Sequence, residues 1–219
     1  MLEELKSILS ERGANLKAQC VQGSTHICQL PRQLQQWNRV LGITGLQLRE
    51  RNKCGELAVV FFRDVYRIST SCRAVRSVLL FHWLLMNHRC VTALLMERSG
   101  FFHCIVYTNL FCDAVAKCTG LRNLQICGHF LWTSACEELL HAVQSLPNIE
   151  EIVCNDFYVG LEYNNMTALA HVIRKTGKLN RFAIEDFGVQ PNGPCVIPGM
   201  CDITAALVCK TAISDLSIE

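Results

Sequence analysis

The C-terminal part of this chain repeats one short pattern of apolar residues at a nearly constant interval. In each copy, an apolar residue occupies relative positions one, four and six. The copies are Val91-Leu94-Met96, Leu121-Leu124-Ile126, Ile149-Ile152-Cys154, Leu179-Phe182-Ile184 and Ile213-Leu216-Ile218. Their starts lie 30, 28, 30 and 34 residues apart. A fixed period in this range is typical of a solenoid, in which each unit buries its apolar face only against its neighbours.

A helical pattern follows the strand pattern within the units. Ser134 and Glu137 have the spacing of a capping box, and apolar residues at helical spacing follow them. Pro147-Asn148 then predicts the end of that helix, just before the next strand. Strands that alternate with helices in this way predict an α/β fold with a parallel sheet.

Residues 1–90 are less periodic and carry a different charge. They hold 13 Lys and Arg against 6 Asp and Glu, whereas residues 91–219 hold 8 against 13. We therefore expect an atypical N-terminal cap and irregular repeat region over 1–90, and regular repeats over 91–219. Within the first part, Leu57 to Phe62 predicts a strand. Ser77 to Met86 predicts a buried helix, with Val78, His82 and Met86 on its inner stripe.

Composition indicates a folded protein in a reducing compartment. Half of the residues are hydrophobic and only 18% are charged, which argues against extended disorder. The 14 cysteines are scattered singly, and several fall on core positions of the repeat, as expected of reduced thiols that pack as small hydrophobes. The longest apolar run is about half the length needed to cross a bilayer. We therefore expect a cytoplasmic protein that has no contact with membranes.

The Leu-x-x-Leu-x-Leu spacing, with one helix per unit, resembles leucine-rich repeats. The helix-containing form is similar to that of ribonuclease inhibitors and of the sensor regions of NOD-like receptors. The resemblance covers roughly residues 91–219 and implies a horseshoe with a parallel concave sheet and outer helices, used to bind proteins. Position nine of each unit, where the family usually has Asn or Cys, is Ser99, His129, Phe157 or Phe187 here. We expect aromatic packing in place of an asparagine ladder at the last two turns.

Strand residues between the apolar positions point to the opposite, outer face of the sheet. Over the last three predicted strands these positions are rich in carboxylates and carry one arginine. The candidate partner-binding residues are Glu150, Glu151, Asp156, Arg181, Glu185, Asp186 and Asp215. Neighbouring strands lie about 4.8 Å apart, so the carboxylates share a negative potential that favours a protein partner with a basic surface. An ordinary solvated face is the alternative interpretation.

Motifs for other kinds of chemistry are missing from the sequence. There is no phosphate loop of the Gly-x-x-x-x-Gly-Lys kind and no Gly-x-Ser-x-Gly elbow, so we expect no enzymatic activity. His103-Cys104 and Cys127-Gly128-His129 have no second ligand pair at a zinc spacing, so we expect neither a metal nor another cofactor. The basic residues before position 90 form no stripe with exposed aromatics, which argues against a nucleic-acid partner.

The first functional hypothesis is therefore a non-enzymatic protein–protein interaction module, a repeat scaffold or sensor that binds its partner on the concave, acidic face. A second hypothesis is a substrate receptor of a ubiquitin ligase, because Leu30-Pro31-x-x-Leu34 faintly resembles the opening of an F-box. A third is a GTPase-activating repeat protein that inserts an exposed arginine, either Arg98 or Arg122, into a nucleotide site.

Overall fold

The computed structural model describes residues 10, 20, 28–51, 55–61, 71–96, 105–127, 134–155, 163–185 and 199–218. Within these residues, seven strands form one sheet, and their order in the sheet is their order in the sequence. The strands are β1 Leu46–Glu50, β2 Leu57–Phe61, β3 Val91–Met96, β4 Asn123–Cys127, β5 Glu151–Asn155, β6 Arg181–Ile184 and β7 Asp215–Ile218. The α/β class is confirmed, and each repeat of the apolar pattern coincides with one of the strands β3 to β7.

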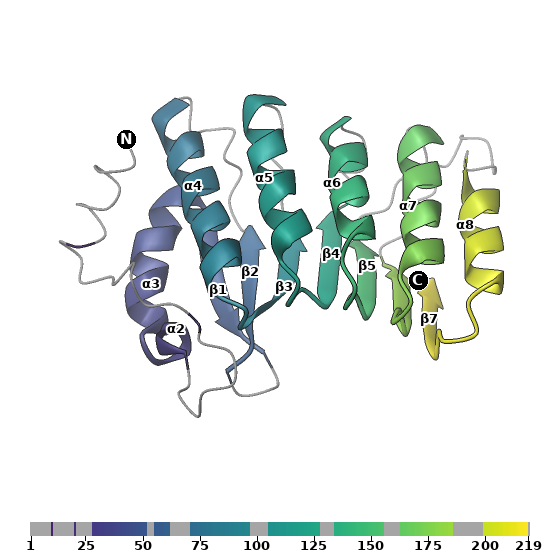
Figure 1. The fold of residues 1–219 in the computed structure, drawn as a ribbon, viewed down its shortest axis with the longest axis horizontal. Helices are drawn as coiled ribbons and strands as arrows, with labels where there is room; N and C mark the ends of the chain where they lie inside the picture. Colours follow the sequence, from purple (N-terminus) through teal and green to yellow (C-terminus); the bar gives the residue numbers. More distant parts are fainter. Residues whose placement is uncertain are drawn as a thin grey trace.

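Helices cover one face of this sheet (Figure 1). α4 to α8 stand side by side in a row in which each helix contacts the next, and α2 and α3 lie at the N-terminal end of the row. The helices are α2 Gln29–Arg32, α3 Leu34–Leu41, the 3-10 helix η1 Gly42–Thr44, α4 Ser71–Asn87, α5 Ile105–Lys117, α6 Ser134–Gln144, α7 Tyr163–Lys175 and α8 Met200–Val208. From β3 onward the chain alternates strand and helix, an arrangement compatible with a repeat solenoid.

The direction of each strand follows from the length of the connection before it. Residues 51–56 join β1 to β2, and the amide of Arg51 donates to the carbonyl of Glu56 at 2.9 Å. So short a connection permits only an antiparallel hairpin, because a parallel crossover needs roughly a dozen residues or more. Every later pair of neighbouring strands has a helix between its members in the sequence and is parallel.

The core lies between the sheet and the helices. Position four of the repeat is buried in four successive strands, as Leu94, Leu124, Ile152 and Phe182. In β7 the same position is Leu216, whose exposed fraction is 54%. The main cluster of buried apolar residues runs from Leu30 to Ala206. Both the sheet and its core therefore extend across the predicted boundary near residue 90.

The same backbone hydrogen bonds recur where each strand begins. The carbonyl of Arg122 accepts from the amides of Glu150 and Glu151, at 2.7 and 3.0 Å. One unit later, the carbonyl of Glu150 accepts from Asn180 and Arg181, and that of Asn180 accepts from Ser214 and Asp215. In each of these units, one carbonyl accepts hydrogen bonds from the amides of two successive residues in the next unit. These units therefore stack in a constant register.

The inner stripe predicted for the helix before β3 is partly wrong. α4 buries Val78 as expected, but Met86 is 45% exposed and the fully covered large side chains are Phe81 and Leu84. Phe81 stacks on Phe111 of α5, with ring centroids 4.5 Å apart. The buried side of α4 thus includes a contact with α5. The spacing of apolar residues within α4 does not predict that contact.

Two further observations bear on the predictions made from the sequence. The position-nine residues Ser99, His129, Phe157 and Phe187 lie outside the described residues. Among the described helices, none is both long enough and apolar enough to cross a membrane.

Candidate functional site

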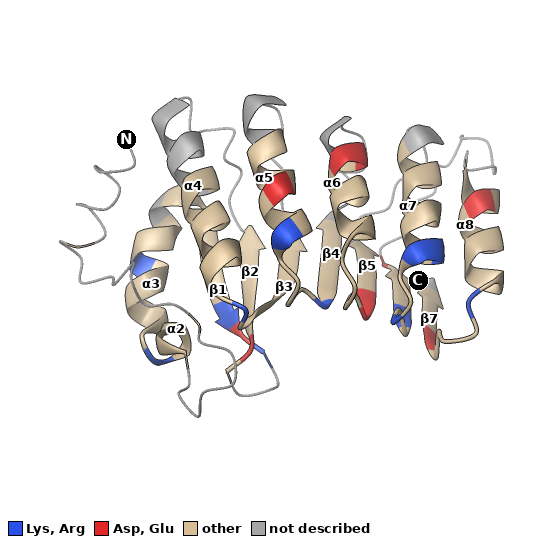
Figure 2. Cartoon of the chain, viewed as in Figure 1, with Lys and Arg blue, Asp and Glu red and all other residues tan. Residues whose placement is uncertain are grey.

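The face of the sheet opposite the helices carries the side chains that the sequence analysis singled out. In register across β4 to β7 lie Asn123, Glu151, Arg181 and Asp215. The in-register stacking of parallel strands places these side chains next to one another, about one strand spacing apart. Basic and acidic segments alternate from strand to strand at the lower ends of β4 to β7 in Figure 2.

Arg181 is the centre of a network of ion pairs on this face. Its guanidinium contacts Glu151 on β5, Asp215 on β7 at 3.0 Å and Glu185, directly after β6, at 3.6 Å. Hydrogen bonding to Glu151 raises the pKa of the Arg181 guanidinium, so the group keeps its charge. Glu151 also accepts a hydrogen bond from the side-chain amide of Asn123, and its side chain is only 19% exposed.

Two more arginines reach the face from outside the last three strands. Arg51, just after β1, lies 3.8 Å from Glu151. Arg122, just before β4, lies 3.3 Å from Glu56 and 3.9 Å from Glu150. The count of one arginine on this face, made over the last three strands, therefore understates the positive charge around these carboxylates.

The predicted site residues fall into two groups. Glu150, Glu151, Arg181, Glu185 and Asp215 lie on or beside the helix-free face, and each belongs to an ion pair. Asp156 and Asp186 lie outside the described residues. Periodicity did not predict the contributions of Arg49, Glu50 and Arg51, which pairing with β2 brings to the same face.

A groove of about 330 Å³ lies on this face. Apolar side chains of neighbouring strands, including Ala58, Leu95 and Val153, form part of its lining, beside the charged network. Its lining residues are Arg49, Glu50, Arg51, Ala58, Leu95, Asn123, Leu124, Gln125, Glu151, Val153, Arg181 and Glu185. Fixed charges beside apolar surface are typical of places where proteins bind other molecules.

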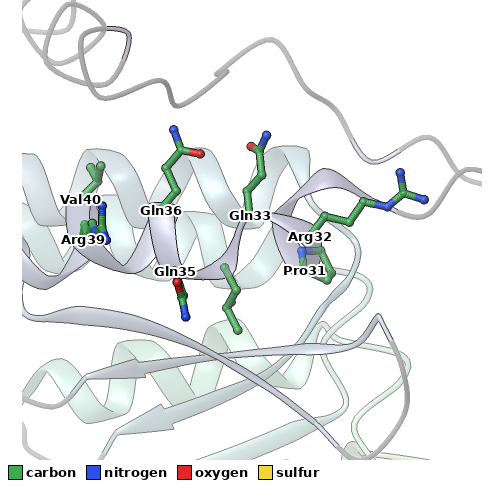
Figure 3. A pocket seen from close by; sticks show the side chains of 8 residues that line it. Pro31, Arg32, Gln33, Gln35, Gln36, Arg39 and Val40 are labelled. Carbon is green, nitrogen blue, oxygen red and sulfur yellow. The ribbon is translucent and has the colours of Figure 1, made fainter.

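A second pocket, of about 690 Å³, lies along α2 and α3 (Figure 3). Gln33 and Gln36 point to one side of the helices, while Gln35 points to the opposite side. Because these polar side chains diverge rather than converge, the pocket does not assemble a recognisable binding chemistry.

Nine cysteines are described as free thiols: Cys20, Cys28, Cys90, Cys112, Cys118, Cys136, Cys154, Cys201 and Cys209. Burial raises the pKa of those that are buried. Both Cys154 and Cys118 lie in the apolar core, where desolvation raises the pKa of Cys154 to about 12 and that of Cys118 to about 11. A hydrogen bond with Cys90, with help from His88, instead lowers the pKa of the Cys28 thiol to about 4. Cys28 is thus a candidate thiolate, in contrast to the neutral thiols of the core.

Among the described residues, one group of side chains is arranged as metal ligands, namely Cys20, Cys28, His88 and Cys90. These four residues differ from the candidate ligands His103-Cys104 and Cys127-Gly128-His129, of which His103-Cys104 and Gly128-His129 lie outside the described residues. The His88-x-Cys90 spacing was the available signal, but its partners Cys20 and Cys28 lie 60 to 70 residues earlier in the sequence.

Comparisons with known protein families, with curated proteins and with solved structures found no match for this chain.

Proposed function

We propose that this chain is a non-enzymatic protein-interaction module, made of repeats of the leucine-rich type that curve into a horseshoe. Its partner is a protein bound on the helix-free face of the sheet. The observation that carries this proposal is the groove beside the Arg181 network, because its charged side chains are already held in place before a partner arrives. Binding to such a face orders few side chains, and this lowers the entropic cost of association.

The charge distribution suggests a basic surface on the partner. On this face, five carboxylates outnumber the three arginines that pair with them: Glu56, Glu150, Glu151, Glu185 and Asp215 against Arg51, Arg122 and Arg181. Glu151 is largely enclosed and positions Arg181, whereas the side chain of Asp215 is 58% exposed. Exposed rim carboxylates attract a basic partner and speed its approach, whereas apolar residues of the groove supply affinity.

The other two hypotheses have no described feature in their favour. Leu30, within the segment that resembles an F-box, is buried in the core that it shares with the sheet, as is Trp37. Neither is available to an adaptor protein. Arg122 is engaged with Glu56 and Glu150 rather than extended as a finger, and Arg98 lies outside the described residues.

The first part of the test identifies the partner. Cross-linking mass spectrometry in the native cell names candidate proteins, and pull-down with purified chain measures each of them. We expect cross-links from the partner to reach Lys or acidic residues on the helix-free face, and association to slow as ionic strength rises, since salt screens the attraction of exposed charges.

The second part compares charge reversals beside the helix-free face of the sheet with charge reversals on helix α6, on the other side of the molecule. We expect Glu150→Lys with Glu185→Lys to weaken partner binding at least roughly tenfold, because rim charges govern encounter and register. The matched control is Glu137→Lys with Glu138→Lys on α6, the same charge change on the helix layer. Binding that survives the first pair and is lost with the second would overturn the proposal. Circular dichroism of each variant confirms that it is folded.

A further inference from the structure

Four potential metal ligands from two distant parts of the chain meet beside the N-terminal end of the helix row. Cys28 directly precedes α2, and Cys20 lies eight positions earlier. His88 and Cys90 lie in the turn that joins α4 to β3. The ligand atoms of all four residues lie within 4.8 Å of one another.

The backbone holds the ligand-bearing segments in place. The amide of Cys20 donates to the carbonyl of Asn87 at 3.0 Å, which brings the N-terminal segment directly to the end of α4. The amide of His88 donates to the carbonyl of Leu84 at 2.9 Å, and the carbonyl of Cys90 accepts from the amide of Leu57 at 2.8 Å. The turn is thus tied both to a helix and to a central strand, so its two ligands are positioned in advance.

His88 has the environment of a ligand rather than that of a surface residue. Its exposed fraction is 1%, and its ring packs edge-on against Trp83, with centroids 4.8 Å apart. Its Nδ1 lies 3.4 Å from the Sγ of Cys28, while its Nε2 is buried without a hydrogen-bond partner among the described residues. Burying an imidazole that makes so few polar contacts lowers the stability of the fold unless Nδ1 has a strong partner.

The spacing and the ligand types both fit zinc. Tetrahedral zinc with bonds of about 2.3 Å to sulfur and about 2.0 Å to nitrogen separates a sulfur ligand from a nitrogen ligand by roughly 3.5 Å. The observed separation of 3.4 Å between Sγ of Cys28 and Nδ1 of His88 agrees with this value. Three thiolates and one imidazole form a closed set of the kind found in structural zinc sites, with no position open for a substrate.

We propose that Cys20, Cys28, His88 and Cys90 bind one zinc ion as a structural Cys₃His site. The ion joins the chain before α2 to the turn between α4 and β3, and so adds to the backbone hydrogen bond that the amide of Cys20 donates to Asn87. It thereby secures α2 and α3 against the first parallel unit of the stack. Binding releases to solvent the protons of those ligands that are still thiols, all three cysteines coordinate the cation as thiolates, and no oxidation occurs.

The test measures metal content and ligand identity in the full chain, expressed with zinc in the medium and purified under reducing conditions without chelator. Elemental analysis is expected to find one zinc per chain, and X-ray absorption at the zinc edge a first shell of three sulfurs and one nitrogen. After removal of zinc, cobalt(II) should give the intense visible bands of a tetrahedral site. A chain that holds no zinc and shows no such bands would overturn the proposal, and so would a disulfide between two of the three cysteines.

Variants locate the metal among the 14 cysteines. Cys28→Ser and Cys90→Ser are expected to lose the zinc, whereas Cys201→Ser and Cys209→Ser, at exposed positions on and after α8, should retain it. If the first two variants do not fold, the cobalt spectrum of the unaltered chain and its protection from alkylation decide the question. Alkylation at Cys28 and Cys90 should appear only after zinc is removed, and labelling of both in the loaded protein would overturn the assignment.

Discussion

Arg181 shows how much of the charged face depends on a single side chain. It contacts carboxylates from β5, from β7 and from the residue after β6, so three negative charges lie around one guanidinium. Its side chain is 37% exposed, and solvent therefore screens each pair. The network is a means of holding charges in position rather than a large source of stability.

Replacing Arg181 should expose the repulsion among its three partners. We expect Arg181→Gln to lower the free energy of unfolding by about 1 kcal/mol, since partly exposed ion pairs contribute little each. The loss should shrink in high salt, because screening weakens the repulsion that remains. Urea denaturation at low and high ionic strength measures both quantities. Lys175→Gln, at an exposed position of α7, is the control and should change little. A loss independent of salt would mean that packing, not charge, explains the role of Arg181.

Gly120 is a second residue whose identity the stacking constrains. A Cβ added at this position would lie 2.8 Å from the backbone carbonyl oxygen of Arg89, in the equivalent turn of the preceding unit. The contact arises between units, and the backbone oxygen cannot move aside without shifting the turn that carries His88 and Cys90. A residue without a Cβ, glycine, is therefore required where these neighbouring turns pass each other.

Gly120→Ala should destabilise the protein by about 1–3 kcal/mol, the usual effect of overpacking. Gly177→Ala is the matched control, because a Cβ at that position would meet nothing within 4 Å. Thermal and chemical denaturation of the two variants measure the difference. Equal stability of the two variants would mean that the turns can separate without cost.

At the scale of elements, the strand–helix units differ chiefly in how many neighbours they have. β3 to β6 each lie between two strands and bury position four of the repeat, whereas β7 has β6 as its single neighbour among the described strands. The exposed Leu216 on β7 and the 80% exposed Val208 on α8 belong to this last unit. In a stack, the neighbouring units cover the apolar side chains of each unit. The same apolar residue therefore contributes less to the free energy of unfolding in the last described unit than in the middle of the stack.

This difference predicts unequal costs for one substitution. Leu124→Ala in β4 should lower the free energy of unfolding by about 2–5 kcal/mol, as expected when a fully buried leucine is truncated. Leu216→Ala in β7 should cost less than about 1 kcal/mol, because half of that side chain is already exposed. Guanidinium denaturation compares the two. A similar cost at both sites would show that β7 is covered in solution.

Side chains in the turns also join neighbouring units. The amide of Asn148 donates to the carbonyl of Thr119 at 2.8 Å, and Lys178 donates to the side chain of Asn148 at 2.7 Å. One unit later, Lys210 donates to the carbonyl of Thr176 at 2.8 Å. These hydrogen bonds lie in the turns just before the strands.

At the scale of the whole molecule, a stack of units has no single centre. Each helix from α4 to α8 contacts the next in line, and the sheet is extended by one strand per unit. Stability is then close to a sum of unit and interface terms, so opening should start at an end with few contacts and proceed inward.

Native-state hydrogen exchange tests this expectation. Amides of β3 to β6 should be the most protected, and those of β7 and α8 should exchange sooner, because this unit has a described neighbour on one side only. Removing zinc should accelerate exchange in α2 and α3 and leave α7 unchanged, if the proposed site secures the N-terminal end. Uniform protection along the chain would instead indicate all-or-none unfolding.

Periodicity determined the repeated strands and the helices between them, because the apolar positions that signal an element lie close together in the sequence. Leu124, Ile152 and Phe182 were predicted and found in the core for this reason. On the helix-free face, the positions of Glu151, Arg181 and Asp215 follow from the same alternation, whereas Glu150 and Glu185 lie just outside the ends of β5 and β6. The antiparallel pairing of β1 with β2 lies outside the repeat and was not readable in this way, so the place of Arg51 on this face was missed. Arg122 lies just before a predicted strand, but the count of charges covered only the last three strands.

Tertiary structure decided what depends on partners distant in the sequence. The orientation of α4 depends on contacts that include the stacking of Phe81 on Phe111 of α5. For this reason the buried side of α4 differs from the predicted stripe. The group of Cys20, Cys28, His88 and Cys90 exists only because the segment before α2 returns to the turn after α4. Local patterns encode elements, since backbone geometry repeats over a few residues. Sites that combine distant segments form only when packing brings those segments together.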